Sequence, residues 1–127
     1  MVAKVGGLVM RVDGTLVFLS ASVAAQIAPL AQITRLPGAP EELLGIALHK
    51  DELVPVIAIG SARDAMVICS YMGENIALVG AVVVRAGVFE PAGASGVTFE
   101  GERAEAFDLG PVYRKVQAGR WGGGWGG

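Results

Sequence analysis

The feature that most constrains this chain is a stretch from Leu44 to Ile59, in which two apolar runs flank a charged tip. The tip reads His49-Lys50-Asp51-Glu52, and an apolar run, a short polar tip and a second apolar run together form the pattern of a β-hairpin. Pro55 has no amide hydrogen to donate, so its strand is expected to lie at a sheet edge or to carry a bulge there. The stretch predicts a fold organised around this pair of strands.

Short strands separated by turn signals are expected through most of the remaining chain. Asp13-Gly14 marks a tight hairpin turn, and residues 87–96 contain a glycine-rich run typical of a surface loop. The continuous apolar run over 65–71 indicates a strand covered on both faces. The predicted strands outside the central hairpin span residues 8–12, 15–19, 65–71, 76–84, 96–102 and 104–109.

Helical structure is expected to be sparse. Ser20 or Ser22 is a suitable cap for a short helical segment over residues 24–27. A proline followed by Glu41 and Glu42 suits the first turn of another helix. A terminal helix is predicted to start near Pro111, since proline is favoured in the first turn and cations follow.

Composition restricts the classes of protein to which the chain belongs. At 127 residues it is expected to form one domain, and with 53% hydrophobic and 17% charged residues much of it must be buried. A net charge of −2 provides no basic field for nucleic acid, so no nucleic-acid partner is expected. The longest apolar run, 76–84, contains Gly80 and is too short to span a membrane. One cysteine and no recognisable signal peptide favour the cytoplasm.

The central hairpin and the turn before it resemble the CheW family, the adaptors of bacterial chemosensory arrays. In that family a leucine–proline turn and a second proline lead to a glycine, an Asn-Leu-Arg-Gly tip, and a strand with proline, valine and aspartate. Aligned without a gap, this chain keeps Pro37, Pro40, Gly45, Pro55 and Val56. The resemblance covers roughly residues 5–116.

Several family positions differ in this chain. The tip reads Leu48-His49-Lys50-Asp51, and Ala58 stands where the family has the strand aspartate. Gln26 and Gly80 likewise occupy positions where the family has acids. These changes leave open a specialised protein that keeps only one of the usual partners.

The resemblance implies an all-β fold with short helices, made of two small five-stranded SH3-like barrels on a shared core over residues 1–119. It also implies a non-catalytic adaptor, with no cofactor or metal, that couples the cytoplasmic tip of chemoreceptors to the regulatory domain of a CheA-type histidine kinase. The alternative is a structural or competitor subunit of an array. His49, Lys50, Asp51 and Glu52 are the expected partner-binding residues, because Lys50 stands where the family has its partner-contacting arginine. The Gly/Trp-rich residues 120–127 are expected to form a mobile tail.

No catalytic constellation is recognisable in the sequence. His49 is the single histidine, which by itself supports neither a catalytic triad nor a histidine-based metal site. Cys69 lies within an apolar strand and is expected to be a buried small hydrophobe. A group of carboxylates near the end of the fold is expected to form a solvated acidic face. This group comprises Glu100, Glu102, Glu105 and Asp108.

Overall fold

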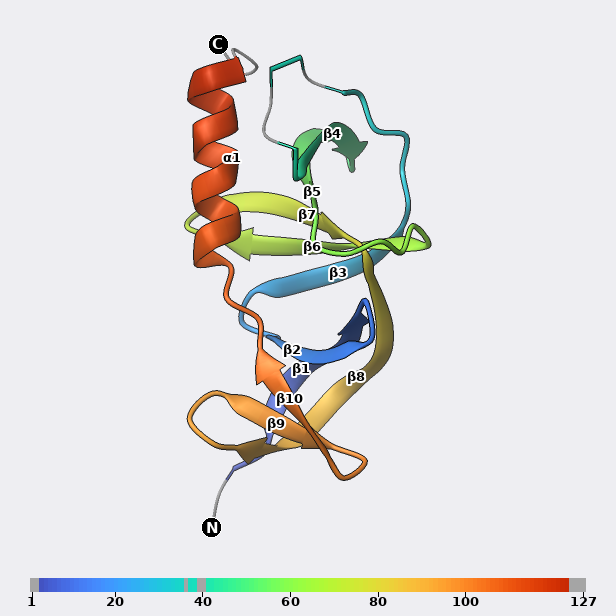
Figure 1. Ribbon diagram of the computed structural model, residues 1–127, viewed down its shortest axis with the longest axis vertical. Helices are drawn as coiled ribbons and strands as arrows, with labels where there is room; N and C mark the ends of the chain where they lie inside the picture. Colours follow the sequence, from blue (N-terminus) through green and yellow to red (C-terminus); the bar gives the residue numbers. More distant parts are fainter. Residues whose placement is uncertain (1–2, 36, 39–40, 124–127) are drawn as a thin grey trace.

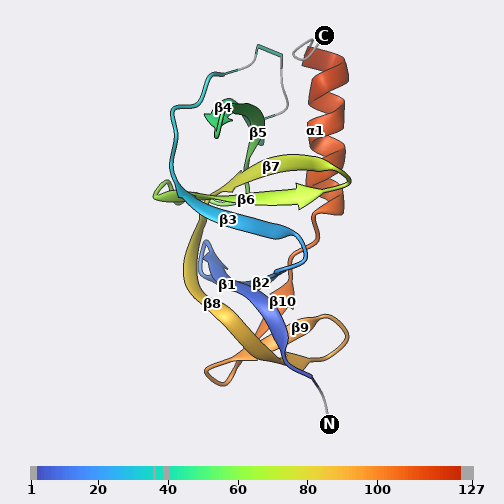
Figure 2. The ribbon, with the colours of Figure 1, turned by 180° about the vertical axis from the view of Figure 1, so that it is seen from behind.

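The computed structural model describes residues 3–35, 37–38 and 41–123, which contain ten strands and one helix. The elements are β1 (Val5–Val12), β2 (Thr15–Ser20), β3 (Ala24–Pro29), β4 (Leu43–His49), β5 (Glu52–Ala58), β6 (Ala65–Tyr71), β7 (Glu74–Val79), β8 (Ala81–Ala92), β9 (Gly96–Phe99), β10 (Glu102–Ala106) and α1 (Gly110–Gly123). Strands β1, β2, β10, β9 and β8 close into a barrel, and the others form a sheet in the order β3-β6-β7-β5-β4. Figures 1 and 2 show the barrel at one end, the sheet next to it and α1 alongside the sheet. The predicted all-β fold of two five-stranded units is confirmed.

The chain passes between barrel and sheet three times, from β2 to β3, from β7 to β8 and from β10 to α1. The second passage occurs at Gly80, whose φ of 118° favours glycine. A Cβ atom at this position would lie 2.2 Å from the backbone nitrogen of Gly60. Residues 76–84 therefore do not form the single predicted strand, because the chain turns at Gly80 from the sheet into the barrel.

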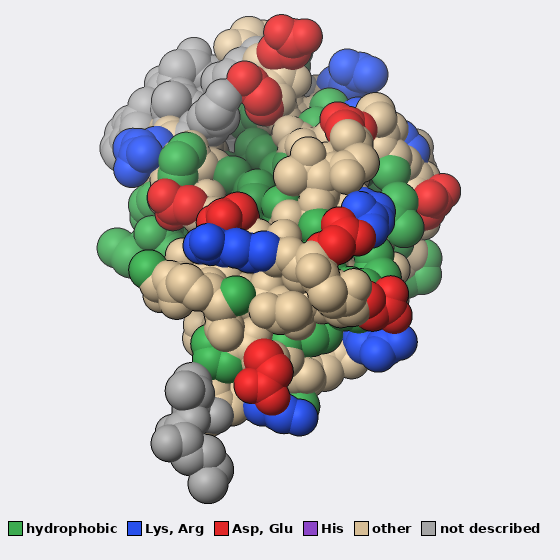
Figure 3. All heavy atoms as spheres, turned by 60° about the horizontal axis from the view of Figure 1, so that its bottom comes forward, with side chains coloured by type: hydrophobic (Ala, Val, Ile, Leu, Met, Phe, Trp, Pro, Cys, Tyr) green, Lys and Arg blue, Asp and Glu red, His purple; other side chains and the backbone are tan. Residues whose placement is uncertain are grey.

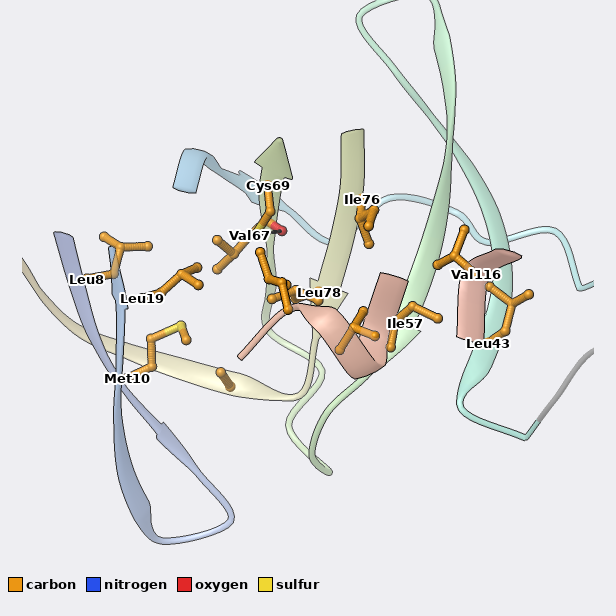
Figure 4. Packing of buried hydrophobic residues seen from close by; sticks show 13 residues of the cluster. Leu8, Met10, Leu19, Leu43, Ile57, Val67, Cys69, Ile76, Leu78 and Val116 are labelled. Atoms are coloured by element: carbon orange, nitrogen blue, oxygen red, sulfur yellow. Dashed lines mark hydrogen bonds between the residues drawn. The ribbon is translucent and has the colours of Figure 1, made fainter. Parts of the chain in front are cut away.

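Buried side chains form three clusters. One lies inside the barrel, one consists of sheet residues alone, and one is shared between barrel and sheet. Figure 4 shows the shared cluster, with residues of β1 and β2 on one side and residues of the sheet and α1 on the other. Its buried members are Leu8, Met10, Leu19, Leu43, Ile57, Val67, Cys69, Ile76, Leu78, Ala81, Leu109, Val112 and Val116. This apolar layer holds the two units together.

The middle strands of the sheet are buried on both faces. On β5, Val56 belongs to the cluster of sheet residues alone and Ile57 to the shared cluster, so the two side chains lie on opposite faces. On β6, Ile68 and Cys69 divide between the same two clusters. Both features follow from the two-residue period of a strand and confirm the sequence prediction.

Of the two alternatives predicted for Pro55, a sheet edge or a bulge, the sheet edge is wrong. β5 lies between β7 and β4, and Pro55 is opposite Ile46 of β4. The register between β5 and β7 begins only at Val56, so the side of Pro55 that lacks an N–H lies outside that ladder. A register irregularity lies close by, between Leu43 and Gly45 on the partner strand.

The helix predicted over residues 24–27 is a strand instead. These residues belong to β3, in which Gln26 is opposite Ile68 and Ile27 opposite Val67 of β6. The hydroxyls of Ser20 and Ser22 lie 2.9 Å apart in the turn before it and cap no helix. Pairing with a strand 40 residues away decides the structure here, and local capping signals do not carry that information.

Two other predictions fail for the same reason. The expected loop over 87–96 is mostly strand, because β8 continues to Ala92 through pairing with β1 and then with β9, and the turn is confined to residues 93–95. Glu41 and Glu42 form a turn and begin no helix. The carbonyl oxygen of Glu42 accepts a hydrogen bond from the N–H of Ala58 at 2.8 Å, which directs the chain into β4.

The terminal helix agrees with its predicted start. Pro111 lies in its first turn, and Asp108 Oδ1 accepts a hydrogen bond from the N–H of Gly110 at 2.9 Å. Val112 and Val116 insert into the shared cluster. The helix extends to Gly123, four residues past the expected domain boundary at 119, and residues 124–127 of the expected tail lie outside the described residues. The mobility of the tail stays a prediction.

Candidate partner-binding site

The predicted site at the β4–β5 tip is a two-residue turn. His49 is opposite Glu52 in the ladder, and Lys50 and Asp51 connect them with φ values of 49° and 64°. Two central residues with positive φ are typical of the type I′ turn, which matches the twist of the flanking strands. Both turn residues are exposed and His49 is partly exposed. The structure therefore brings all four predicted residues to one projecting end of the sheet.

Glu52 differs from the rest of the tip because it has a partner within the sheet. Its Oε1 accepts a hydrogen bond from Asn75 Nδ2 at 2.6 Å, which links the base of the tip to β7. Lys50 and Asp51 are the tip residues that project beyond this contact. Within the described residues, no group of three or more His, Cys, Asp or Glu side chains is arranged to hold a metal ion.

An exposed leucine pair, Leu48 and Leu53, lies directly behind the tip. The two residues are opposite each other across the ladder and are 61% and 62% exposed. The sequence predicts that the apolar residues flanking the tip belong to the core, and for this pair that prediction is wrong. Together with Gln32 and Thr34 the pair borders a hollow of about 290 Å³. An apolar surface next to a charged tip is typical of a protein contact.

A second candidate surface is a groove between the barrel and the sheet, which the sequence analysis missed. It measures about 340 Å³ and is lined mainly by apolar and glycine residues of β1, β3 and β8. The lining residues are Gly6, Gly7, Leu8, Ala21, Gln26, Ile27, Ala86 and Gly87. At its margin Ile27 is 44% exposed, and Val88, whose Cγ1 approaches Gly6, is 64% exposed.

Two glycines that line this groove differ in the space around them. A Cβ atom on Gly7 would lie 2.3 Å from the carbonyl oxygen of Leu19, whereas one on Gly87 would meet nothing within 4 Å. Gly7 is therefore required by the fold, whereas the position of Gly87 leaves space for a side chain. The Gly6-Gly7 doublet was the available sequence signal, but it becomes informative only when β3 and β8 are placed beside it.

The other candidate residues do not form a reactive centre. Burial raises the pKa of Cys69 to about 12, which keeps its thiol protonated and unreactive, as expected for a buried small hydrophobe. Three of the four carboxylates of the predicted acidic face have cationic neighbours. Glu100 lies 4.0 Å from Arg85, Glu102 lies 3.3 Å from Arg11, and Glu105 lies 3.1 Å from Arg103. Figure 3 shows acidic and basic side chains interspersed over the barrel end of the molecule.

Comparison with known proteins identifies the fold. No protein-family model matches the chain, and no curated protein is similar to it in sequence. Among solved structures, the chain is similar to the scaffolding protein TtCheW from Thermoanaerobacter tengcongensis, with a TM-score of 0.71 and 16% identity. The similarity covers 84% of this chain and 90% of TtCheW. The chain has the fold of a CheW scaffolding protein.

This CheW-like fold gives the two surfaces their context. The β4–β5 tip belongs to the sheet alone, whereas the groove is shared by barrel and sheet. In the part of the chain that the structure describes, no helix is long and apolar enough to cross a membrane.

Proposed function

We propose that the protein is a non-catalytic cytoplasmic adaptor that couples the cytoplasmic tip of chemoreceptors to the regulatory domain of a CheA-type histidine kinase. The observation that carries this proposal is the CheW scaffold fold, which covers 84% of this chain and 90% of the chain compared with it. The burial of Cys69 and the pairing of carboxylates with arginines are consistent with a protein that acts through contacts.

Coupling two partners requires two surfaces that can be occupied at the same time. The tip surface, defined as His49 to Glu52 with Leu48 and Leu53, is formed by β4 and β5 only. The groove uses residues of β1, β3 and β8, and no residue belongs to both surfaces. We assign one partner to each surface, since the two surfaces share no residue and each exposes apolar side chains that can contribute affinity.

Pairwise titrations test this division. Lys50→Glu reverses the charge at the tip, and Val88→Glu places a charge at the margin of the groove; both positions are exposed, so both variants are expected to fold. Each variant should weaken binding to one partner, kinase regulatory domain or receptor tip, and leave the other unchanged. Binding of only one partner by the parent protein would favour a structural or competitor subunit. Binding of neither would overturn the proposal.

A further inference from the structure

The groove lies at one end of the junction between barrel and sheet. At the other end, hydrogen bonds between Asp13 and Ser61, here called the tie, link the two units. The groove residues of β1 are Gly6, Gly7 and Leu8, whereas the tie lies at Asp13, just after the same strand ends. Six residue-to-residue steps lead from Gly7 to Asp13, a distance of about 20 Å at the rise of a β-strand. The two features therefore lie at opposite ends of β1.

The tie joins a turn of the barrel to a connection of the sheet. Asp13 lies in the β1–β2 turn and Ser61 lies shortly after β5, 48 residues further along the chain. Asp13 Oδ1 accepts hydrogen bonds from the backbone N–H of Ser61 at 3.0 Å and from its hydroxyl. These bonds, with the nearby Arg63 guanidinium, hold the pKa of Asp13 below its usual value. The side chain is thus an ionised acceptor at neutral pH.

The backbones of the two units also meet at this end. Gly60 precedes Ser61 and contacts Gly80, where the chain passes from β7 into β8. A Cβ atom on Gly60 would lie 3.0 Å from Cγ1 of Val12 on β1. Figures 1 and 2 both show the β1–β2 turn close to the start of β8. Backbone contacts therefore reinforce the tie at this end of the junction. At the groove end the link is the β2–β3 connection, in which the N–H of Ala21 donates to the carbonyl oxygen of Gly6 at 3.0 Å and the carbonyl oxygen of Val23 accepts from the N–H of Ser70 at 2.7 Å.

The geometry points to Asp13 and Ser61 as positioning residues that fix the angle between barrel and sheet and thereby set the width of the groove. A rotation of about 10° at the tie would move the groove end by roughly 3 Å over the length of β1. The shared apolar cluster holds the units together, but apolar contacts are non-directional and permit small sliding movements. Hydrogen bonds to one carboxylate oxygen are directional, so they select one angle.

A distance measurement across the groove tests the inference without any partner. Spin labels are attached at Ile27→Cys and Val88→Cys, which lie on opposite margins and are exposed, while the native Cys69 is buried. Asp13→Gly removes the carboxylate and keeps a Gly-Gly turn compatible with type I′ geometry. Ser61→Ala removes only the hydroxyl donor. We expect a broader distribution shifted to longer distances for Asp13→Gly and a smaller change in the same direction for Ser61→Ala.

Glu105→Gln is the matched control, because it removes the negative charge of an exposed ion pair, that with Arg103, which lies within the barrel. It should leave the distance distribution as in the parent. If the tie had a purely structural role, its removal would lower the melting temperature without changing the distance between the spin labels in the folded state. Unchanged distributions in folded Asp13→Gly and Ser61→Ala would overturn the inference, and Ser61→Ala decides the question if Asp13→Gly does not fold.

Discussion

The barrel and the sheet differ in the side chains that they bury and in whether their strand edges are paired. The barrel is closed, and its interior contains Phe18, Phe89 and Phe99 in edge-to-face contacts with ring centroids 6.0 and 6.1 Å apart. The sheet has an aliphatic interior and ends at strands β3 and β4. Among the described residues, the β4 edge is covered at Ile46 by a bridge in which Thr34 and Ile46 exchange two backbone hydrogen bonds.

The exposed large hydrophobic side chains follow this difference only in part, because three of the seven among the described residues lie on β8, a strand of the barrel. Within the described residues they lie in the sheet, in the turn after β6 and on β8, the strand that leads from the sheet into the barrel. They are Ile27, Leu48, Leu53, Met72, Val82, Val84 and Val88. Contacts with partners are therefore expected at the sheet, whose edges are not closed, and along β8 at the junction of the two units.

The largest effect is expected inside the barrel. Phe89→Ala removes a buried ring that contacts two others, so the free energy of unfolding should fall by about 3–5 kcal/mol. Denaturant unfolding measures this change. A loss below about 1 kcal/mol would contradict a tightly packed aromatic core.

Truncations on β5 compare the interior of the sheet with the shared cluster. Val56→Ala and Ile57→Ala should each lower the free energy of unfolding by about 1–5 kcal/mol, with Ile57→Ala the larger because it removes more buried carbon. If both losses stay under about 0.5 kcal/mol, β5 is misplaced.

Charge reversal at the tip should separate folding from binding. Lys50→Glu is expected to change the free energy of unfolding by no more than about 0.5 kcal/mol, because Lys50 is exposed on a turn. It should weaken binding to one partner by about 1–3 kcal/mol if Lys50 lies in the core of the interface, and by less at its rim. Calorimetric titration with parallel melting curves measures both. Equal affinities for both partners in parent and variant would remove Lys50 from the site.

The smallest effect comes from comparing the two tight turns. The barrel turn is Asp13-Gly14 and the tip is Lys50-Asp51, and the residues of both have positive φ. Asparagine and glycine suit such a turn better than lysine and aspartate, so the double change Lys50→Asn, Asp51→Gly should raise the free energy of unfolding by about 0.5–1 kcal/mol. Lower stability would show that the tip contacts its surroundings more than the structure indicates.

The sequence predicts the features that depend on neighbours along the chain. The Asp13-Gly14 turn, the central hairpin and the double-sided burial of Ile68 and Cys69 all follow from local patterns, and all are confirmed. β3 and the second half of β8 were mispredicted, because their strand character comes from pairing with β6, β1 and β9, remote in sequence.

The candidate surfaces divide in the same way. The charged tip is continuous in sequence and could be proposed from it, whereas the groove combines three segments separated by up to 80 residues. The exposure of Leu48 and Leu53 depends on how far the core extends along β4 and β5, which a hydrophobic pattern does not specify.

One measurement tests the central claim that two separate surfaces couple two partners. The protein, a purified kinase regulatory domain and a receptor-tip fragment are mixed in equal amounts and their masses determined by light scattering after size exclusion. Because the tip surface and the groove share no residue, we predict a single complex that contains all three components. Mutually exclusive binary complexes would show that the partners compete for one surface and would contradict the account.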